Sequence, residues 1–400
     1  MRYAQLRSVT AAGAAVIGAA ALILITWSGP VAEAQSPPAG QSGSWSVPRT
    51  AWGDPDLQGK WAVADTGTPM ERPASLGNRE FLTEAEVAER SGSLAKELPA
   101  DDADAPVVRK GQPEHERGIR GEEYNRFWLN NPKVIRPWNR ASLVVDPPDG
   151  LLPPLTREAL ARLEAREKAR GARGEADDWF DRNLSERCLL TAFVRFQMSA
   201  AAVMVVKQIL QAPGSVAMLL GTLNSNEVVV IPLDKRPLPS TSLRRWLGIS
   251  RGHWDGTTLV VETTHVNNQQ DGGPVMPSRL PLAMPGGSHL GTGETARIVE
   301  RFNRVAPDTI EYSYTIDDPK TYVRPYTVLL PLAKQADDLL MPENGCHEGN
   351  YGIVGQLAAG RADEAYALRA ARAEADTRKL ALQKMRERTE AWVKSAGKTP

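Results

Sequence analysis

Ser250–Val266 reads SRGHWDGTTLVVETTHV, Ala296–Leu332 reads ARIVERFNRVAPDTIEYSYTIDDPKTYVRPYTVLLPL, and these two segments decide the fold of the chain. In both of them apolar and polar residues alternate with a period of two. The turn dipeptides Asp255-Gly256 and Pro307-Asp308 interrupt the alternation. This pattern predicts antiparallel strands joined as hairpins, each with one buried face and one face that meets water or lines a cavity.

One charged residue falls on an apolar face of these strands. Glu300 has the same phase as Ile298 and Phe302, and an unpaired carboxylate is costly to bury. In one interpretation Glu300 lies at an edge or forms a structural salt bridge with a nearby arginine: Arg301, Arg304 or Arg324. In the other, Glu300 and the guanidinium of Arg324 converge in a cavity inside a barrel.

The rest of the chain adds short strands and a few helices. β-prone segments bounded by turn residues occur at 60–64, 141–145, 203–211, 215–221 and 227–233. A capping box predicts a helix over 83–96, an apolar stripe predicts one starting at Thr156, and a segment without glycine or proline predicts one over 361–394. Many closely spaced strands with peripheral helices predict a mainly β protein, either an antiparallel lipocalin-like barrel or a sandwich, with a C-terminal helix.

Four parts are expected along the chain. Residues 1–34 have the basic start, apolar run and Ala32-Glu33-Ala34 site of a signal peptide, although a retained membrane anchor is the alternative. Residues 35–50 form a linker, 51–358 a β-barrel-like domain with helical insertions, and 359–400 the C-terminal helix. We therefore expect an exported protein, periplasmic or secreted, with no membrane span after signal cleavage.

Export gives the two cysteines a structural meaning. In an oxidising compartment Cys188 and Cys346 are expected to form a disulfide; the alternatives are two buried thiols or a reactive Cys346. His347 and Glu348 follow Cys346 directly. A histidine held by a pinned loop can act as a general acid or base near neutral pH, whereas the alternative is a loop that only plugs the barrel.

Composition and motifs exclude several classes of function. Lys and Arg total 48 and Asp and Glu total 48, so the chain has no net field that favours nucleic acid or an anionic membrane. The sequence has no metal-binding motif, no phosphate-binding glycine loop and no nucleophile elbow. We expect no metal and no cofactor, and the oligomeric state stays open.

Several sequence blocks resemble a known family. DPDLQGKW, ASLVVDPPDG, SERCL, IPLDKRP, HWDGTTLVVETTHV, VERFNRV, DDPKTYVRPYT and CHEGNYG occur between Gly53 and Gly355, and their order is similar to that in a family of uncharacterised exported bacterial proteins. The chain departs from the family pattern at Thr257, where aspartate is usual, and at Leu238, where a polar residue is frequent. The resemblance implies the fold and export rather than an activity.

The first functional hypothesis is a cofactor-independent lyase, isomerase or hydrolase that acts on a small apolar or aromatic molecule. Its catalytic candidates are His347, Glu348, Glu300 and Arg324, and its substrate-binding candidates are Arg140, Trp254, His265, Tyr312 and Tyr326. The second hypothesis is a binding protein that carries an apolar ligand in the barrel. The third is an envelope interaction protein that docks a partner through its C-terminal helix.

Overall fold

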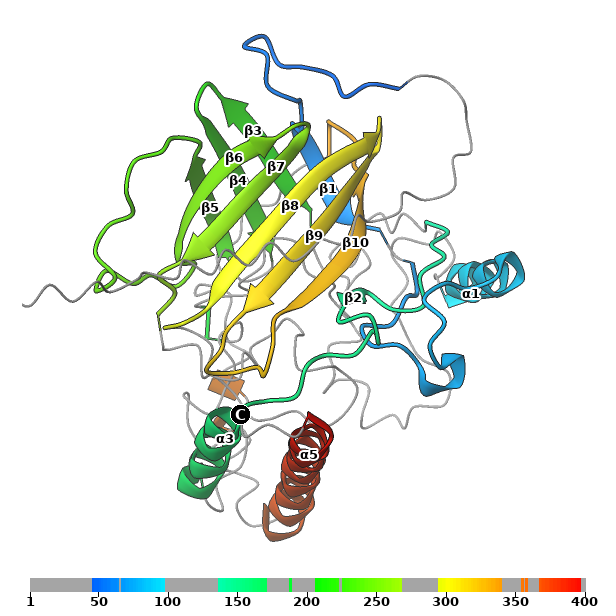
Figure 1. Ribbon diagram of the computed structural model, residues 1–400, viewed down its shortest axis with the longest axis vertical. Helices are drawn as coiled ribbons and strands as arrows, with labels where there is room; N and C mark the ends of the chain where they lie inside the picture. The colour runs from blue at the N-terminus through cyan, green and yellow to red at the C-terminus, as the bar shows by residue number, and fades with distance from the viewer. Residues whose placement is uncertain are drawn as a thin grey trace, which may run out of the picture. The chain divides into compact units, whose positions relative to one another are not determined.

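The computed structural model describes residues 45–64, 66–97, 136–170, 187–188, 206–222, 225–267, 294–339, 354–355, 357–358 and 367–396. These residues form a mainly β protein whose strands belong to one ten-stranded sheet (Figure 1). The strands are β1 (Gly59–Val63), β2 (Val144–Asp146), β3 (Lys207–Ala212), β4 (Ser215–Thr222), β5 (Ser225–Pro232), β6 (Ile249–Asp255), β7 (Thr258–Thr264), β8 (Arg297–Ala306), β9 (Thr309–Asp317) and β10 (Tyr326–Lys334). The expected mainly β, antiparallel fold is confirmed, and it is a barrel rather than a sandwich.

The sheet curves into a nearly closed barrel whose neighbouring strands follow the order β5-β4-β3-β1-β10-β9-β8-β7-β6 (Figure 1). Strand β2 lies off this path and pairs with β10. All the paired strands are antiparallel. Because an odd number of strands lies along the path, the two end strands, β5 and β6, run in the same direction.

The seam between β5 and β6 is packed by side chains. A Cβ atom added at Gly252 in β6 would lie 2.7 Å from Leu233 Cδ2 and 3.0 Å from Ile231 Cγ2. Ile231 belongs to β5 and Leu233 follows that strand directly. The barrel therefore closes where the backbone of Gly252 lies against two apolar side chains, and a larger residue there would have to displace them.

Local sequence signals explain where several elements begin. Gly256, with a φ of 60°, makes the turn between β6 and β7 that the Asp-Gly dipeptide predicts. At the start of α1 (Glu84–Glu97), Glu86 N donates to Thr83 Oγ1 at 3.3 Å and Thr83 N donates to Glu86 Oε2 at 2.8 Å, which is the predicted capping box. At the start of α3 (Arg157–Arg170), Ala159 N donates to Thr156 Oγ1 at 3.1 Å.

The N-terminal segment before β1 caps one end of the barrel. Arg304 donates to the carbonyl oxygens of Asp56 at 2.8 Å and Pro307 at 2.6 Å, and its guanidinium lies 5.5 Å from the centre of the Trp61 ring. Leu57 N donates to Gln211 Oε1 at 2.7 Å. Leu57 is fully buried, so the segment before β1 is packed against the barrel.

Two helices join the core through the loops at the other end. Ala159, Leu160 and Leu163 form the buried stripe of α3, as its sequence predicts. The C-terminal helix α5 (Ala367–Ala396) adds Ala381 and Met385 to the same apolar cluster. A short 3₁₀ helix, Ala74–Leu76, precedes α1. Within the described ranges, no helix combines the length and the apolar character needed to cross a membrane.

The expected division of the chain is only partly covered. Residues 1–34, the expected signal peptide, and residues 35–44 of the linker lie outside the described residues, so both stay predictions. Helix α5 falls within the expected helical segment 359–400.

Candidate functional site

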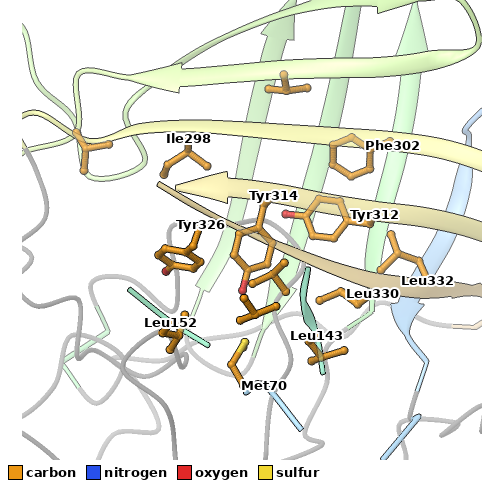
Figure 2. Packing of buried hydrophobic residues seen from close by; sticks show 14 of the residues in the cluster. Met70, Leu143, Leu152, Ile298, Phe302, Tyr312, Tyr314, Tyr326, Leu330 and Leu332 are labelled. Carbon is orange, nitrogen blue, oxygen red and sulfur yellow. The ribbon is translucent and has the colours of Figure 1, made fainter. Parts of the chain in front are cut away.

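Inward-facing side chains of β6 to β10 align in three rows across the barrel wall. The strand register gives a first row of Trp254, Leu259, Phe302, Tyr312 and Leu330, a second row of Gly252, Val261, Glu300, Tyr314 and Val328, and a third row of Ser250, Thr263, Ile298, Ile316 and Tyr326. Figure 2 shows the three tyrosine rings of these rows together with Met70, Leu143 and Leu152, which belong to the same buried cluster. The interior is thus aromatic and aliphatic, with a carboxyl group in its middle row.

That carboxyl group, Glu300, is bound to a tyrosine of the first row. Glu300 and Tyr312 are each 0% exposed, and Tyr312 Oη donates to Glu300 Oε1 at 2.6 Å. The two residues are diagonal neighbours on β8 and β9. Apolar rings surround the phenol, since the Tyr312 ring centre lies 4.8 Å from that of Phe302 and 5.9 Å from that of Tyr314. A carboxyl–phenol pair inside an apolar barrel is the strongest candidate for a functional group in the described chain.

The arginines considered as partners of Glu300 have other contacts. Arg301 forms a salt bridge with Asp255 at 2.7 Å, and Arg324 forms one with Asp146 at 3.3 Å. Arg304 donates to backbone carbonyls at the capped end. Arg324 belongs to the loop before β10, and its side chain is 43% exposed, so it does not share the barrel interior with Glu300.

Burial keeps the other tyrosines of the interior neutral. It raises the pKa of Tyr314 above the ordinary value, and the neighbouring Tyr322 adds to this shift. Burial likewise raises the pKa of Tyr326, whose ring packs edge-on against Tyr322 at 5.2 Å. Neutral phenols can donate and accept hydrogen bonds without bringing a charge into the apolar interior.

Three further polar side chains face the interior from β6 and β7. Trp254 packs partly buried against the core, and its Nε1 atom is buried with no hydrogen-bond partner among the described residues. Ser250 Oγ and Thr263 Oγ1 share a hydrogen bond of 2.8 Å in the third row. The predicted residues Glu300, Trp254, Tyr312 and Tyr326 therefore lie on one side of one sheet.

Two of the other predicted residues lie elsewhere. The guanidinium of Arg140 lies 5.1 Å from the centre of the Phe81 ring, and Phe81 is 38% exposed. Burial lowers the pKa of Arg140, while Glu80 and Glu311 act in the opposite direction. His265 follows β7 with a φ of 58°; its Nδ1 shares a hydrogen bond of 2.8 Å with Thr264 Oγ1, and its Nε2 lies 3.2 Å from Pro239 O. Neither residue is brought to Glu300.

The remaining candidates cannot be compared with the structure. His347, Glu348 and Cys346 lie outside the described residues. Cys188 is described, in a turn with a φ of 56°, but its pairing with Cys346 stays a prediction.

One buried acidic residue had no sequence signal that would single it out. Asp318, 1% exposed, lies in the turn after β9, where Thr295 Oγ1 donates to its Oδ1 and its Oδ2 is buried without a hydrogen-bond partner among the described residues. Its backbone oxygen accepts from Thr321 N at 2.9 Å and Tyr322 N at 2.8 Å. The DDPK sequence reads as an exposed turn, and only the tertiary fold places the second aspartate inside.

Comparisons were made with family models, curated proteins and solved structures. None of these comparisons found a match. In the described part of the chain no three His, Cys, Asp or Glu side chains are grouped so that they could hold a metal ion.

Proposed function

We propose that this protein is an exported enzyme that performs acid–base chemistry on a small apolar or aromatic molecule in the barrel. The observation that carries the proposal is the fully buried Glu300 carboxyl, which accepts a hydrogen bond from Tyr312 at 2.6 Å. Carboxyl groups are costly to bury, and acid–base enzymes place them in apolar surroundings to tune proton transfer. No cofactor is part of the proposal.

The division of roles follows from the hydrogen bond. Glu300 is the group that exchanges a proton with the bound molecule, and Tyr312 orients its carboxyl by donating to one oxygen. The apolar and aromatic residues of the three rows suit a ligand that is itself largely apolar, because transfer of its surface out of water drives binding. Lyase, isomerase and hydrolase reactions all fit this chemistry.

The second candidate function is binding without reaction. It is supported by the aromatic composition of the interior: Phe302, Tyr312, Tyr314 and Tyr326 are buried there, and such rings stack on aromatic molecules whether or not a proton moves. A transport or sequestration protein would use the same rows.

Glu300→Gln separates the two functions. Glutamine keeps the shape and an oxygen that accepts from Tyr312, but it cannot take a proton at neutral pH. A molecule retained by the purified protein, identified by native mass spectrometry and supplied back in solution, is the probe. Binding with turnover that Glu300→Gln abolishes supports the enzyme. Binding without turnover in either protein supports the carrier, and loss of binding in the variant contradicts the assigned role of Glu300.

The loop after Cys346 completes the proposal. A disulfide between Cys188 and Cys346 would pin His347 and Glu348, and His347 would then be the second acid–base group. For the disulfide, we expect the mass of the exported protein to increase by two hydrogen atoms on reduction. For His347, we expect His347→Ala to lose turnover and to keep its thermal stability. If His347→Ala also loses stability, the loop has a structural role.

A further inference from the structure

Exposed apolar side chains gather on one part of the barrel. The outer faces of β3, β4 and β5 and the connection from β5 to β6 carry Leu210, Val228, Val230, Leu238 and Leu243, which are 46%, 59%, 60%, 40% and 54% exposed. These are five of the eleven exposed large hydrophobic residues in the described chain. A soluble surface usually scatters such residues singly, so a concentration of them indicates an interaction surface.

The strand register makes this part of the sheet a largely apolar face. Leu210 lies opposite Ala217, and Ala217 lies opposite Val230. In the next row Gln208 lies opposite Leu219, and Leu219 lies opposite Val228. None of these six outward positions is charged, whereas the outward positions of β7 and β8 carry the ion pair of Glu262 and Arg297, at 2.8 Å. The apolar face is therefore a local feature of β3, β4 and β5.

The connection that follows β5 and leads to β6 carries an excess of positive charge. Figure 1 shows this connection running beside β5. From Val228 to Trp254 the basic residues are Lys235, Arg236, Arg244, Arg245 and Arg251, and Asp234 is the only acidic one. Arg236 Nη2 pairs with Asp234 Oδ2 at 2.5 Å, and Arg251 Nε lies 3.9 Å from Asp234 Oδ1. Lys235 and Arg245 are exposed, so the excess of positive charge is presented to solvent.

We propose that the outer face of β3, β4 and β5, with residues 233–245, is a surface that docks on an anionic lipid membrane. The exposed leucines enter the boundary between head groups and acyl chains, and the lysine and arginine side chains attract anionic head groups. A sheet face with an adjoining loop offers an open surface rather than a groove, which suits a bilayer better than an extended peptide. This local charge coexists with the zero net charge of the chain, so the attraction depends on how the molecule is oriented.

The test is flotation of the full chain with vesicles of phosphatidylcholine alone or with added phosphatidylglycerol. Wild-type protein is expected to bind more when phosphatidylglycerol is present and to lose this increment at high salt. Lys235→Glu with Arg245→Glu should reduce the increment by about tenfold or more. Leu238→Ser with Leu243→Ser should weaken binding to the same vesicles without abolishing its salt dependence.

Lys379→Glu with Leu380→Ser is the matched control, because these side chains are exposed on α5, Leu380 to 50%. This control variant should show the same increase in binding with phosphatidylglycerol as the wild-type protein. Residues 11–27 are present in every variant, so their affinity for lipid cancels in the comparison. Equal binding to both vesicle types, or an increment that all variants keep, would overturn the proposal. Binding to polyglutamate without binding to vesicles would overturn it in favour of an acidic protein partner.

Discussion

The hydrogen bond between Tyr312 and Glu300 has a stabilising role that can be measured apart from any activity. Both residues are fully buried, so Tyr312→Phe removes a hydrogen bond from a carboxyl group in the interior. We expect the free energy of unfolding to fall by about 1–3 kcal/mol, measured by urea denaturation. Tyr314→Phe is the control, because Tyr314 is a buried tyrosine in the adjacent row of the same strand. An equal loss in both variants would show that ring packing, not the hydrogen bond, is responsible.

The buried phenols also predict how stability depends on alkaline pH. Burial raises the pKa of Tyr314 and Tyr326 in the folded protein, so the neutral forms are favoured there. This contribution to stability is complete below the ordinary tyrosine pKa of about 10 and is lost as pH rises above it toward the folded values. Absorbance of tyrosinate should therefore appear for these residues only together with unfolding. Titration of all tyrosines in the native protein near pH 10 would contradict the burial of these rings.

At the scale of single elements, Gly252 is the residue on which the seam between β5 and β6 depends. Gly252→Val would place methyl groups where Leu233 and Ile231 already pack, and overpacking of this kind costs about 1–3 kcal/mol. Adding Leu233→Ala removes the nearer side chain and should restore part of the loss. Chemical denaturation of the single and double variants measures the coupling.

Gly92 provides the matched control for the seam. It lies in α1, and nothing is within 4 Å of a Cβ atom built there. Gly92→Val should change the free energy of unfolding by less than about 0.5 kcal/mol, because valine and glycine differ little in helix propensity. If both glycine variants lose the same stability, the cost is a property of valine and not of the seam.

Strand pairing explains how much of the site could be predicted from sequence. Alternation placed Glu300 and Tyr312 on inward faces, because a buried face imposes a period of two wherever a strand is regular. It failed to separate Arg324 and His265 from that site. Arg324 precedes the first residue of β10, and the chain leaves the strand after Thr264, where His265 takes a φ of 58°. An alternating sequence pattern can continue past the end of a strand, whereas the pairing with the neighbouring strand stops there.

At the scale of the whole molecule, the register of β8 and β9 was beyond sequence reasoning. The diagonal contact between Glu300 and Tyr312 depends on a two-residue turn at Pro307-Asp308 and on the shift in register beside Arg304. One residue more in that turn would exchange the inward and outward sets of β9. The parallel direction of β5 and β6 at the seam could not be predicted from sequence either. It follows from the number of strands in the barrel and not from any one segment.

Helix α5 is connected to the barrel by a continuous buried path. Ala381, Met385 and Thr389 recur every four residues on one face of α5, and Thr389 Oγ1 donates to Leu155 O at 3.0 Å. Leu155 in turn bridges to Tyr322, which packs against Tyr326 inside the barrel. Arg388 reinforces the contact by donating to Glu71 Oε1 at 2.8 Å. The weak apolar stripe in the sequence of α5 thus marks a docked face, and the helix contributes to the stability of the whole domain.

Met385→Asp tests this connection at the scale of the molecule. Met385 is 9% exposed within the apolar cluster, so an aspartate there should lower the free energy of unfolding by about 3 kcal/mol or more. Leu380→Asp, at a residue 50% exposed on the same helix, makes the same chemical change and should cost less than about 1 kcal/mol. The barrel tyrosines report the result, because their absorbance should shift in the same transition as the helical circular dichroism if α5 and the barrel unfold as one unit. Two separate transitions in the wild-type protein would show that the helix is an independent attachment.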